Sequence, residues 1–414
     1  MQEELDWWLE HGETEELLLH MPDNSVDALV TDPPAGIGFM GREWDKNKGG
    51  RDQWIAWLRG VLEECRRVMK PGAMGWVWAL PRTAHWTATA CEDAGFAVRD
   101  VLVHVFGTGF PKSRALLKPA SEHWILIKAP GDLRELRIEE NRIVAGANDD
   151  SRRVRHNSAS IGFGGSEINF QSGGAAGRWP ANFALSHDDD CKASGTRKVK
   201  TGVAVRRNFE GGEKQRGFLA SAASGPDMTY GDADGTETVE AWQCVEGCPV
   251  RMLDEQSGER PSGSGNKNKK NHSDNAVFGK GLGKGVGDGV GGDSGGASRF
   301  FYTAKPSTRE RSEGLPAGTR NVHTTVKSIK LMEHLVSLIA APGDLVLDPF
   351  AGSGTTGIAA LKQRCRFVGI EKEAEYVQIA RQRLAHAAAL AKTFPHKIGR
   401  RTTTAENSKQ GRLL

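Results

Sequence analysis

The sequence has no apolar run as long as the roughly 18 residues that a membrane-spanning helix requires. Its first six residues also lack the basic and then apolar segments of a secretory signal. These absences predict a soluble, cytoplasmic protein without a membrane partner. The length of 414 residues exceeds that of one average domain and predicts a core with one sizeable insertion or second domain.

Cysteines are few, and the net charge is small. Six cysteines in a chain of this length do not suggest a disulfide framework, and Cys65, Cys91 and Cys365 lie in apolar segments that favour small core residues. With a net charge of +3, a polyanionic partner can be inferred only from where basic residues gather. Either a phosphate-contacting surface or solvated loops would explain the basic segments, which are 152–155, 197–200, 206–207, 267–270 and 397–412.

Strands and helices alternate at both ends of the sequence, which predicts an α/β fold with a mostly parallel sheet. The expected strands are 26–31, 75–80, 98–105, 124–127, 344–348 and 366–370, and the clearest helices begin near 52, 83 and 329. Between about 131 and 300 we expect no regular structure, and the glycine-rich tract 257–298 is expected to be mobile. Residues 1–130 and 303–395 should therefore build one core, with an insertion at 131–302 and a basic tail at 396–414.

A glycine-rich loop follows the strand that ends at Asp348. Gly352, Gly354 and Gly357 form a G-x-G-x-x-G pattern at the start of a helix, and the next strand ends in Glu371, which suits an acid that accepts hydrogen bonds from ribose hydroxyls. Asp348 would repel the pyrophosphate of a nicotinamide dinucleotide but attract the ammonium group of S-adenosylmethionine. The loop therefore favours S-adenosylmethionine over a dinucleotide or a glycine turn without a ligand.

The Asp-Pro-Pro turn after the first strand suits methyl transfer to an amino group of a DNA base. Such a nitrogen is a poor nucleophile because its lone pair is delocalised into the ring. Asp32 and the backbone carbonyl of Pro33 can accept its two hydrogens, and Pro34 helps to hold that carbonyl rigidly. The base must leave the duplex to be reached. Asp-Pro-Pro by itself also ends many ordinary strands.

Together, the turn and the glycine loop resemble those of the β class of amino DNA methyltransferases. In that class the catalytic turn precedes the target-recognition region, which precedes the cofactor loop, and this chain has the same order. The resemblance reaches to about residue 395 and leaves the glycine-rich tract and the tail uncovered. The segments that resemble the class are 24–27, 31–34, 36–45, 107–113, 117–120, 301–305, 323–327 and 348–357.

The resemblance implies a Rossmann-like, S-adenosylmethionine-dependent core, with 131–302 as a target-recognition insertion. It implies double-stranded DNA as substrate and a homodimer that would suit a palindromic site. Aspartate in the catalytic turn, where the cytosine-modifying branch more often has serine, favours adenine as the target. The expected cofactor-binding residues are Thr324, Thr325, Lys327, Asp348, Phe350, Ala351, Gly352, Ser353, Gly354, Glu371 and Lys372, and the expected DNA-binding residues are Phe39, Trp44, Lys112, Arg152, Arg153 and Arg155.

Two positions depart from the family pattern. Thr324 replaces a usual proline, which we expect to be tolerated. Ala35 replaces the tyrosine whose ring stacks on the flipped base, a contact worth about 1–3 kcal/mol. An introduced change that impairs catalysis is favoured over a natural variant in which Phe39 or Trp44 holds the base. The alternatives to an impaired adenine methyltransferase are a catalytically silent DNA-binding protein and a cytosine amino methyltransferase.

Two pairs of metal-binding residue types lie in the insertion. His187 and Cys191, like Cys244 and Cys248, are separated by three residues. Four such side chains can form a closed tetrahedral zinc site that staples a segment with little core of its own. Two buried pairs without a metal, or a redox pair, are the alternatives. Methyl transfer itself needs no metal.

Overall fold

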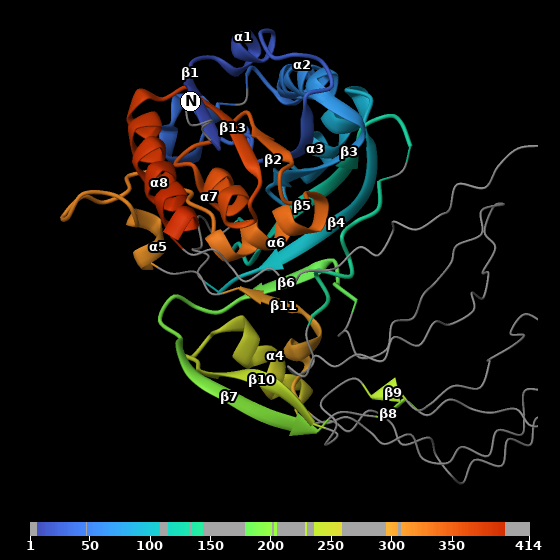
Figure 1. Ribbon diagram of the computed structural model, residues 1–414, viewed down its shortest axis with the longest axis vertical. Coiled ribbons are helices and arrows are strands. Elements are labelled where there is room, and N and C mark those ends of the chain that lie inside the picture. The colour runs from blue at the N-terminus through green and yellow to red at the C-terminus, as the bar shows by residue number, and fades with distance from the viewer. Residues whose placement is uncertain are drawn as a thin grey trace, which may run out of the picture.

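The computed structural model describes residues 6–46, 48–107, 115–132, 134–143, 179–200, 203–204, 228–229, 236–258, 295–304 and 308–393. A nine-stranded sheet with the order β1-β13-β12-β2-β3-β5-β4-β6-β11 forms the centre of the fold (Figure 1). Its strands are β1 Trp7–His11, β2 Val26–Thr31, β3 Met69–Ala79, β4 Ala97–Val105, β5 Ser121–Lys128, β6 Phe183–Ser186, β11 Tyr302–Ala304, β12 Leu345–Asp348 and β13 Arg366–Glu371. Every pairing in this sheet is parallel except the two made by β5. The predicted α/β class with a mostly parallel sheet is confirmed.

Helices cover both faces of the sheet (Figure 1). The longer ones are α2 Arg51–Val68, α3 Ala84–Asp93, α6 Ile329–Ile339, α7 Thr355–Lys362 and α8 Ala374–Thr393, and the short ones include α1 Thr14–Leu18 and α5 Thr308–Ser312. Buried residues of α2 and α3 pack with Leu29 and Ile127 on one face. Those of α6, α7 and α8 pack with Ala28 and Val30 on the other. Because successive side chains of a strand point to opposite faces, β2 contributes to both layers.

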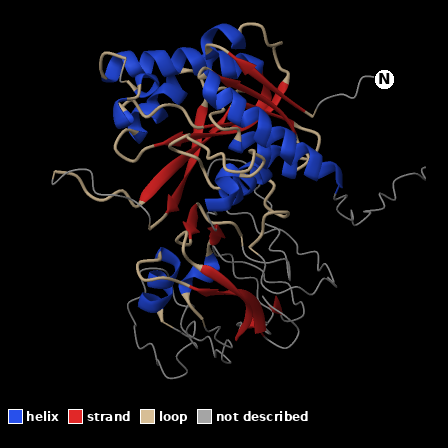
Figure 2. Cartoon of the chain, turned by 90° about the vertical axis from the view of Figure 1, so that its left-hand side faces the viewer, coloured by secondary structure: helices blue, strands red, loops and turns tan. Residues whose placement is uncertain are grey.

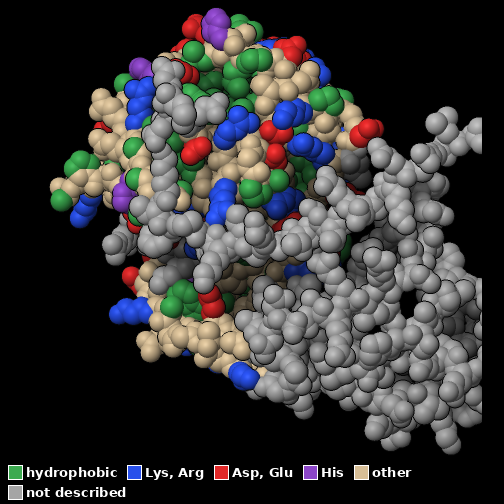
Figure 3. Space-filling model, viewed as in Figure 1, with side chains coloured by type: hydrophobic (Ala, Val, Ile, Leu, Met, Phe, Trp, Pro, Cys, Tyr) green, Lys and Arg blue, Asp and Glu red, His purple; other side chains and the backbone are tan. Residues whose placement is uncertain are grey.

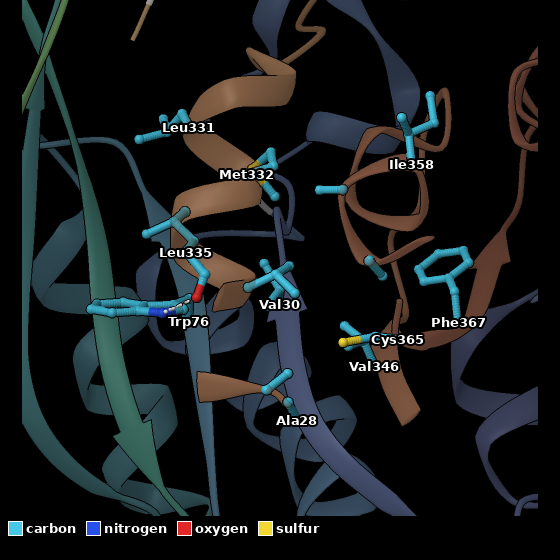
Figure 4. Packing of buried hydrophobic residues seen from close by; sticks show 14 of the residues in the cluster. Ala28, Val30, Trp76, Leu331, Met332, Leu335, Val346, Ile358, Cys365 and Phe367 are labelled. Carbon is cyan, nitrogen blue, oxygen red and sulfur yellow. Dashed lines mark hydrogen bonds between the residues drawn. The ribbon is translucent and has the colours of Figure 1, made fainter. Parts of the chain in front are cut away.

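The layer under α6 shows how a polar group is accommodated in this core. Trp76 of β3 packs among Val30, Leu331 and Leu335, and its indole Nε1 donates to the carbonyl oxygen of Leu335 at 3.0 Å (Figure 4). The bond satisfies the only donor of an otherwise apolar ring. Cys65, Cys91 and Cys365 are buried in the two main layers, as expected of small core residues.

A smaller lobe lies beyond β6 and β11 (Figures 1 and 2). Strands β7 Lys192–Lys200 and β10 Thr236–Gln243 form an antiparallel pair, α4 Pro249–Ser257 lies beside them, and β8 Val203–Ala204 and β9 Met228–Thr229 form a short separate pair. The expectation of no regular structure between 131 and 300 is therefore wrong. Part of that range, β6, even belongs to the main sheet, where four residues gain enough pairing from β4 and β11 to form a strand without a long apolar pattern.

The described residues contain no helix long and apolar enough to cross a membrane. The glycine-rich tract lies almost wholly outside the described residues, since only 257–258 and 295–298 of it are described. The basic tail 396–414 also lies outside them.

Candidate active site

A cavity of about 260 Å³ opens where β2 and β12 end. These strands are neighbours in the parallel sheet, with Leu29 opposite Leu347, so the loops that follow them leave the sheet at the same edge. One loop carries Asp32 and the other begins at Asp348. Ligands in open parallel sheets bind outside the carboxyl ends of the strands, and the two predicted motifs meet at such a place.

Most of the predicted site residues share this cavity. Those that line it are Asp32, Pro33, Pro34, Ala35, Phe39, Trp44, Thr325, Lys327, Asp348, Phe350, Ala351, Gly352, Ser353, Glu371 and Lys372. Thr324 and Gly354 are described but are not among its lining residues. Lys112, Arg152, Arg153 and Arg155 lie outside the described residues. Gly354, at φ 79°, is instead the N-cap of α7, a conformation that suits glycine.

The glycine loop and the acid at the end of β13 hold each other in place. Glu371 accepts a hydrogen bond from the Gly352 backbone nitrogen at 2.7 Å and another from the Glu373 nitrogen at 2.8 Å. Gly352 has φ 53°, and a Cβ there would lie 2.8 Å from Nε2 of His323. Glycine is required at this position on both grounds. The loop therefore closely approaches the His323 segment and the carboxylate expected to bind ribose.

Asp348 connects the glycine loop to β2 through hydrogen bonds. Its carboxylate accepts from Thr31 Oγ1 at 2.9 Å, from the Phe350 nitrogen at 3.1 Å and from Thr356 Oγ1 at 2.6 Å. Burial raises its pKa to about 7, against the lowering effect of these donors. The sequence predicted a carboxylate free to attract an ammonium group, whereas three donors of the chain already share this one. Its observed contacts tie the glycine loop to β2.

Asp32 is the end of a chain of polar side chains that crosses the sheet. Lys327 Nζ lies 3.0 Å from Asp32 Oδ2 and 3.4 Å from Glu122 Oε2. Glu122 Oε1 lies 2.8 Å from His104 Nδ1, and His104 Nε2 lies 2.7 Å from Ser186 Oγ. Glu122, His104 and Ser186 stand on the adjacent strands β5, β4 and β6. We call these five side chains the Lys327 network.

The Lys327 network places one ammonium group between two buried carboxylates. Burial raises the pKa of Asp32 to about 6, while Lys327 opposes that rise. Burial alone would also raise the pKa of Glu122, but Lys327, His104 and the Trp78 indole hold it below its usual range. The Lys327 ammonium also lies 4.0 Å from the centre of the Trp78 ring, a cation–π contact. Lys327 thus favours the ionised form of both carboxylates.

The sequence predicted Lys327 and Asp32 as site residues but not Glu122, His104 or Ser186. Glu122 lies in the polar first residues of β5, and the predicted strand 124–127 began two residues after it. His104 was inside the predicted strand 98–105, but its sequence neighbours give no sign of a site. Their pairing depends on β4 lying beside β5, with His104 opposite Glu122. His323, whose pKa burial lowers to about 4, also lines the cavity; it belongs to the matched segment 323–327 but was not among the expected cofactor-binding residues.

The loop after the catalytic turn presents aromatic rings to the cavity. Asp45 is buried and accepts from the backbone nitrogens of Gly36 at 2.9 Å and Phe39 at 2.7 Å, which closes the loop on itself. Gly36 has φ 70° and lies against the Trp54 ring, where a Cβ would be 2.5 Å from ring atoms. The closed loop brings Phe39 and a second aromatic residue, Trp44, to the wall that Ala35 shares.

Comparisons with known proteins give the family of the chain. Residues 26–382 match the N6/N4 family described as DNA methylase. The chain is 48% identical over 62 residues to the Type II methyltransferase M2.DpnII of Streptococcus pneumoniae, covering 15% of this chain and 23% of the relative. It is 38% identical over 91 residues to the DNA adenine methyltransferase YhdJ of Escherichia coli K12, covering 22% of this chain and 31% of that relative. The alignments thus span less than a third of either relative.

Two solved structures match the chain at low TM-scores. The PvuII DNA methyltransferase, described as cytosine-N4-specific, has a TM-score of 0.45 at 12% identity over 93% of this chain and 91% of that one. The M1.HpyAVI complex with S-adenosylmethionine has a TM-score of 0.39 at 17% identity, over 91% of this chain and 98% of that one. The family match, in contrast, covers both strand-and-helix halves and both loops of the cavity. The chain belongs to the N6/N4 DNA methylase family.

Proposed function

We propose that the chain transfers a methyl group from S-adenosylmethionine to the exocyclic amino group of an adenine that has been flipped out of double-stranded DNA. The observation that carries this proposal is that the Asp32 turn and the Glu371 glycine loop open into one cavity. An amino group held at the first can therefore meet a methyl donor held at the second.

The residues around the glycine loop fit this cofactor. Phe350, Ile370 and Trp57 line the cavity with apolar surface, against which an adenine ring can pack. Glu371 can accept hydrogen bonds from ribose hydroxyls. When bound, S-adenosylmethionine supplies a methyl group on a positively charged sulfur. The acidic lining from Asp32 and Glu371 is compatible with that charge.

Replacing Glu371 by alanine is expected to weaken S-adenosylmethionine binding by at least about tenfold, or roughly 1.4 kcal/mol. The change removes the ribose acceptor and also the partner of the Gly352 nitrogen. Calorimetric titration with the cofactor measures it. Glu375→Ala, which removes an exposed carboxylate four residues on, is the matched control and should bind normally. Unchanged affinity in Glu371→Ala would remove Glu371 from the cofactor site.

The catalytic turn acts on the amino group of the base. Asp32 and the Pro33 carbonyl accept its two hydrogens, which directs the nitrogen lone pair toward the methyl group. After the nitrogen–methyl bond has formed and the sulfur–methyl bond has broken, the nitrogen must lose one proton, and ionised Asp32 can accept it. Lys327 keeps Asp32 ionised and oriented before this step.

Replacing Lys327 by methionine is expected to move the acidic limb of the pH–rate profile upward. Protonated Asp32 cannot accept from the amino group, so methylation should fall as the pH drops through about 6 in the unaltered chain. Lys327 lowers the pKa of Asp32, and its removal therefore raises the pH at which activity is lost. Single-turnover rates from pH 5 to 9 measure the shift.

A matched substitution controls that experiment. Lys327→Arg keeps a positive charge beside Asp32 and should leave the acidic limb close to that of the unaltered chain. If the Lys327→Met rate is lower at every pH and the acidic limb of the pH–rate profile stays at the same pH, Lys327 does not act through the ionisation of Asp32.

Double-stranded DNA is the proposed substrate, and the described surface contributes one of the expected basic segments. Arg197 and Lys198 are exposed on β7, in the smaller lobe. On the face shown in Figure 3, the basic side chains of the described residues lie among acidic ones. The other basic segments expected to contact DNA lie outside the described residues.

A catalytically silent DNA-binding protein is the second candidate. It is favoured by Ala35, which cannot stack on a flipped base from its place on the cavity wall. Phe39 and Trp44 share that wall and are the rings available to replace the stack. Adenine is proposed over cytosine because aspartate stands at position 32.

A further inference from the structure

We propose that His187, Cys191, Cys244 and Cys248 bind a structural zinc ion that holds the smaller lobe to the main sheet. One ligand atom from each of the four side chains lies within 4.8 Å of all the others. The proposal goes beyond the methyl-transfer function, which needs no metal, and it concerns a different part of the molecule. We call these four side chains the zinc cluster.

The pairing of β7 with β10 explains why two distant pairs of residues meet. Cys191 immediately precedes β7 and Cys244 immediately follows β10, and the first residue of β7, Lys192, lies opposite the last of β10, Gln243. Both pairs therefore emerge at the same end of the antiparallel strands. His187 follows the end of β6 on the approach to β7.

Each pair is closed by a tight turn. The Cys191 nitrogen donates to the Asp188 carbonyl at 3.1 Å, and the Cys248 nitrogen donates to the Val245 carbonyl at 3.3 Å. Gly247, at φ 81°, supplies the left-handed residue just before Cys248. In each pair, the turn brings together two side chains that are separated by three residues in the sequence. The sequence alone could not show that they converge.

The distances within the zinc cluster suit a tetrahedral ion. Nδ1 of His187 lies 3.3 Å from Cys244 Sγ and 3.6 Å from Cys248 Sγ. Ligand bonds of about 2.1 Å to nitrogen and 2.3 Å to sulfur at tetrahedral angles place those atoms about 3.5 Å apart. The four ligand atoms lie around one point, which favours a single metal site over two separate buried pairs without a metal. A disulfide would use only two of the three cysteines.

Burial indicates a structural ion. Cys191 and Cys248 are 1% and 0% exposed, and His187 is 3% exposed. Four protein ligands complete the tetrahedral coordination of zinc, so no position remains for a substrate or water. A catalytic zinc site would keep such a position open.

Among the described residues, the smaller lobe has a small hydrophobic cluster. Its four buried members are Leu185, Cys191, Cys248 and Val250, two of which belong to the zinc cluster, and the other hydrophobic residues packed against it are only partly buried. A core of this size cannot order a lobe by apolar burial alone, and metal binding commonly supplies that stability in small units.

The zinc cluster also adjoins the Lys327 network. His187 directly follows Ser186, the residue of that network on β6, and the His187 backbone nitrogen donates to the Ala304 carbonyl of β11 at 2.9 Å. A metal ion bound by His187 would therefore fix the edge of the main sheet as well as the smaller lobe.

The full-length chain, purified without added metal, tests the proposal. Elemental analysis should find about one zinc per chain. Replacement of zinc by cobalt(II) should give the visible absorption of tetrahedral coordination and the charge-transfer bands of thiolate ligands. After chelation, limited proteolysis should cut between 187 and 258 while the core fragments persist. Absence of zinc together with a cobalt spectrum lacking thiolate bands would overturn the proposal, as would a disulfide between two of these cysteines in the unreduced protein.

A matched pair of variants locates the metal. Cys248→Ser should lower zinc affinity by at least about tenfold, measured by competition with a chromogenic chelator. Cys365→Ser makes the same chemical change in the main core, at a thiol that donates to the Ala341 carbonyl, and should keep the metal. Equal zinc affinity in both variants would remove Cys248 from the site. If Cys248→Ser does not fold, the cobalt spectrum of the unaltered chain decides the question.

Discussion

Replacing Asp32 by alanine is expected to lower the rate of methyl transfer by about 100- to 1,000-fold, the loss typical when one preorganised hydrogen-bonding group is removed from an active site. Asp32 provides one of the two acceptors for the amino hydrogens, and the Pro33 carbonyl remains as the other. Lys327, which lies 3.0 Å from Asp32, would then retain only Glu122 as an ion-pair partner. Single-turnover rates with saturating cofactor and DNA measure the loss.

The controls for this variant separate chemistry from folding. Cofactor affinity should stay within about threefold, or less than roughly 0.7 kcal/mol, because Glu371 and the glycine loop are unchanged. Asp52→Ala removes a carboxylate that is 80% exposed in the first turn of α2 and should leave the rate unaffected. A rate in Asp32→Ala equal to that of Asp52→Ala would exclude Asp32 from the reaction.

Replacing Ala35 by tyrosine is expected to raise the methylation rate by an order of magnitude or more. A stack worth about 2 kcal/mol corresponds to roughly thirtyfold in rate when it is made only with the correctly placed base. Ala35 lines the cavity beside Asp32, so a ring introduced there can face the flipped base. Cofactor affinity should change little, because the ribose acceptor and the glycine loop lie on other elements.

Ala35→Leu is the matched control, since it adds apolar volume without an aromatic face. Ala35→Leu should raise the methylation rate less than Ala35→Tyr does. Its stabilisation of the transition state should be roughly 1 kcal/mol at most, which is half of that expected from the tyrosine stack. An unchanged rate in Ala35→Tyr would mean either that Phe39 or Trp44 already holds the base or that the chain is not an amino methyltransferase. Removing each of those rings in turn would then identify which one does so.

Much of the fold could be predicted because the core strands are strongly patterned. The strand at 26–31 was predicted with the bounds that the structure gives to β2, and the helix expected from near 52 is α2, which begins at Arg51. β1 was missed because its five residues include exposed and charged side chains at the edge of the sheet. β6 and β11 were missed because strands of three or four residues depend on their neighbours for definition.

The parts of the candidate site that could be predicted are those in which a single loop contains the complete sequence motif. The Asp32 turn and the glycine loop are contiguous motifs, and the parallel pairing of β2 with β12 brings them together. The Lys327 network could not be predicted in the same way. It joins residues of β4, β5 and β6 with Asp32 and Lys327, which lie outside the strands, and only the strand order makes them neighbours. The detailed role of Asp348 also depended on its three donors, which the sequence does not reveal.

The most direct test of the account is transfer of a labelled methyl group from S-adenosylmethionine to DNA, followed by digestion of the DNA to nucleosides and identification of the labelled base. The unaltered chain and Ala35→Tyr should be assayed together under single-turnover conditions, with Asp32→Ala as the inactive control. The account predicts label in N6-methyladenine, faster with Ala35→Tyr and nearly absent with Asp32→Ala. Label in N4-methylcytosine would contradict the proposed target base, and no labelled base with either active-site version would contradict methyl transfer itself.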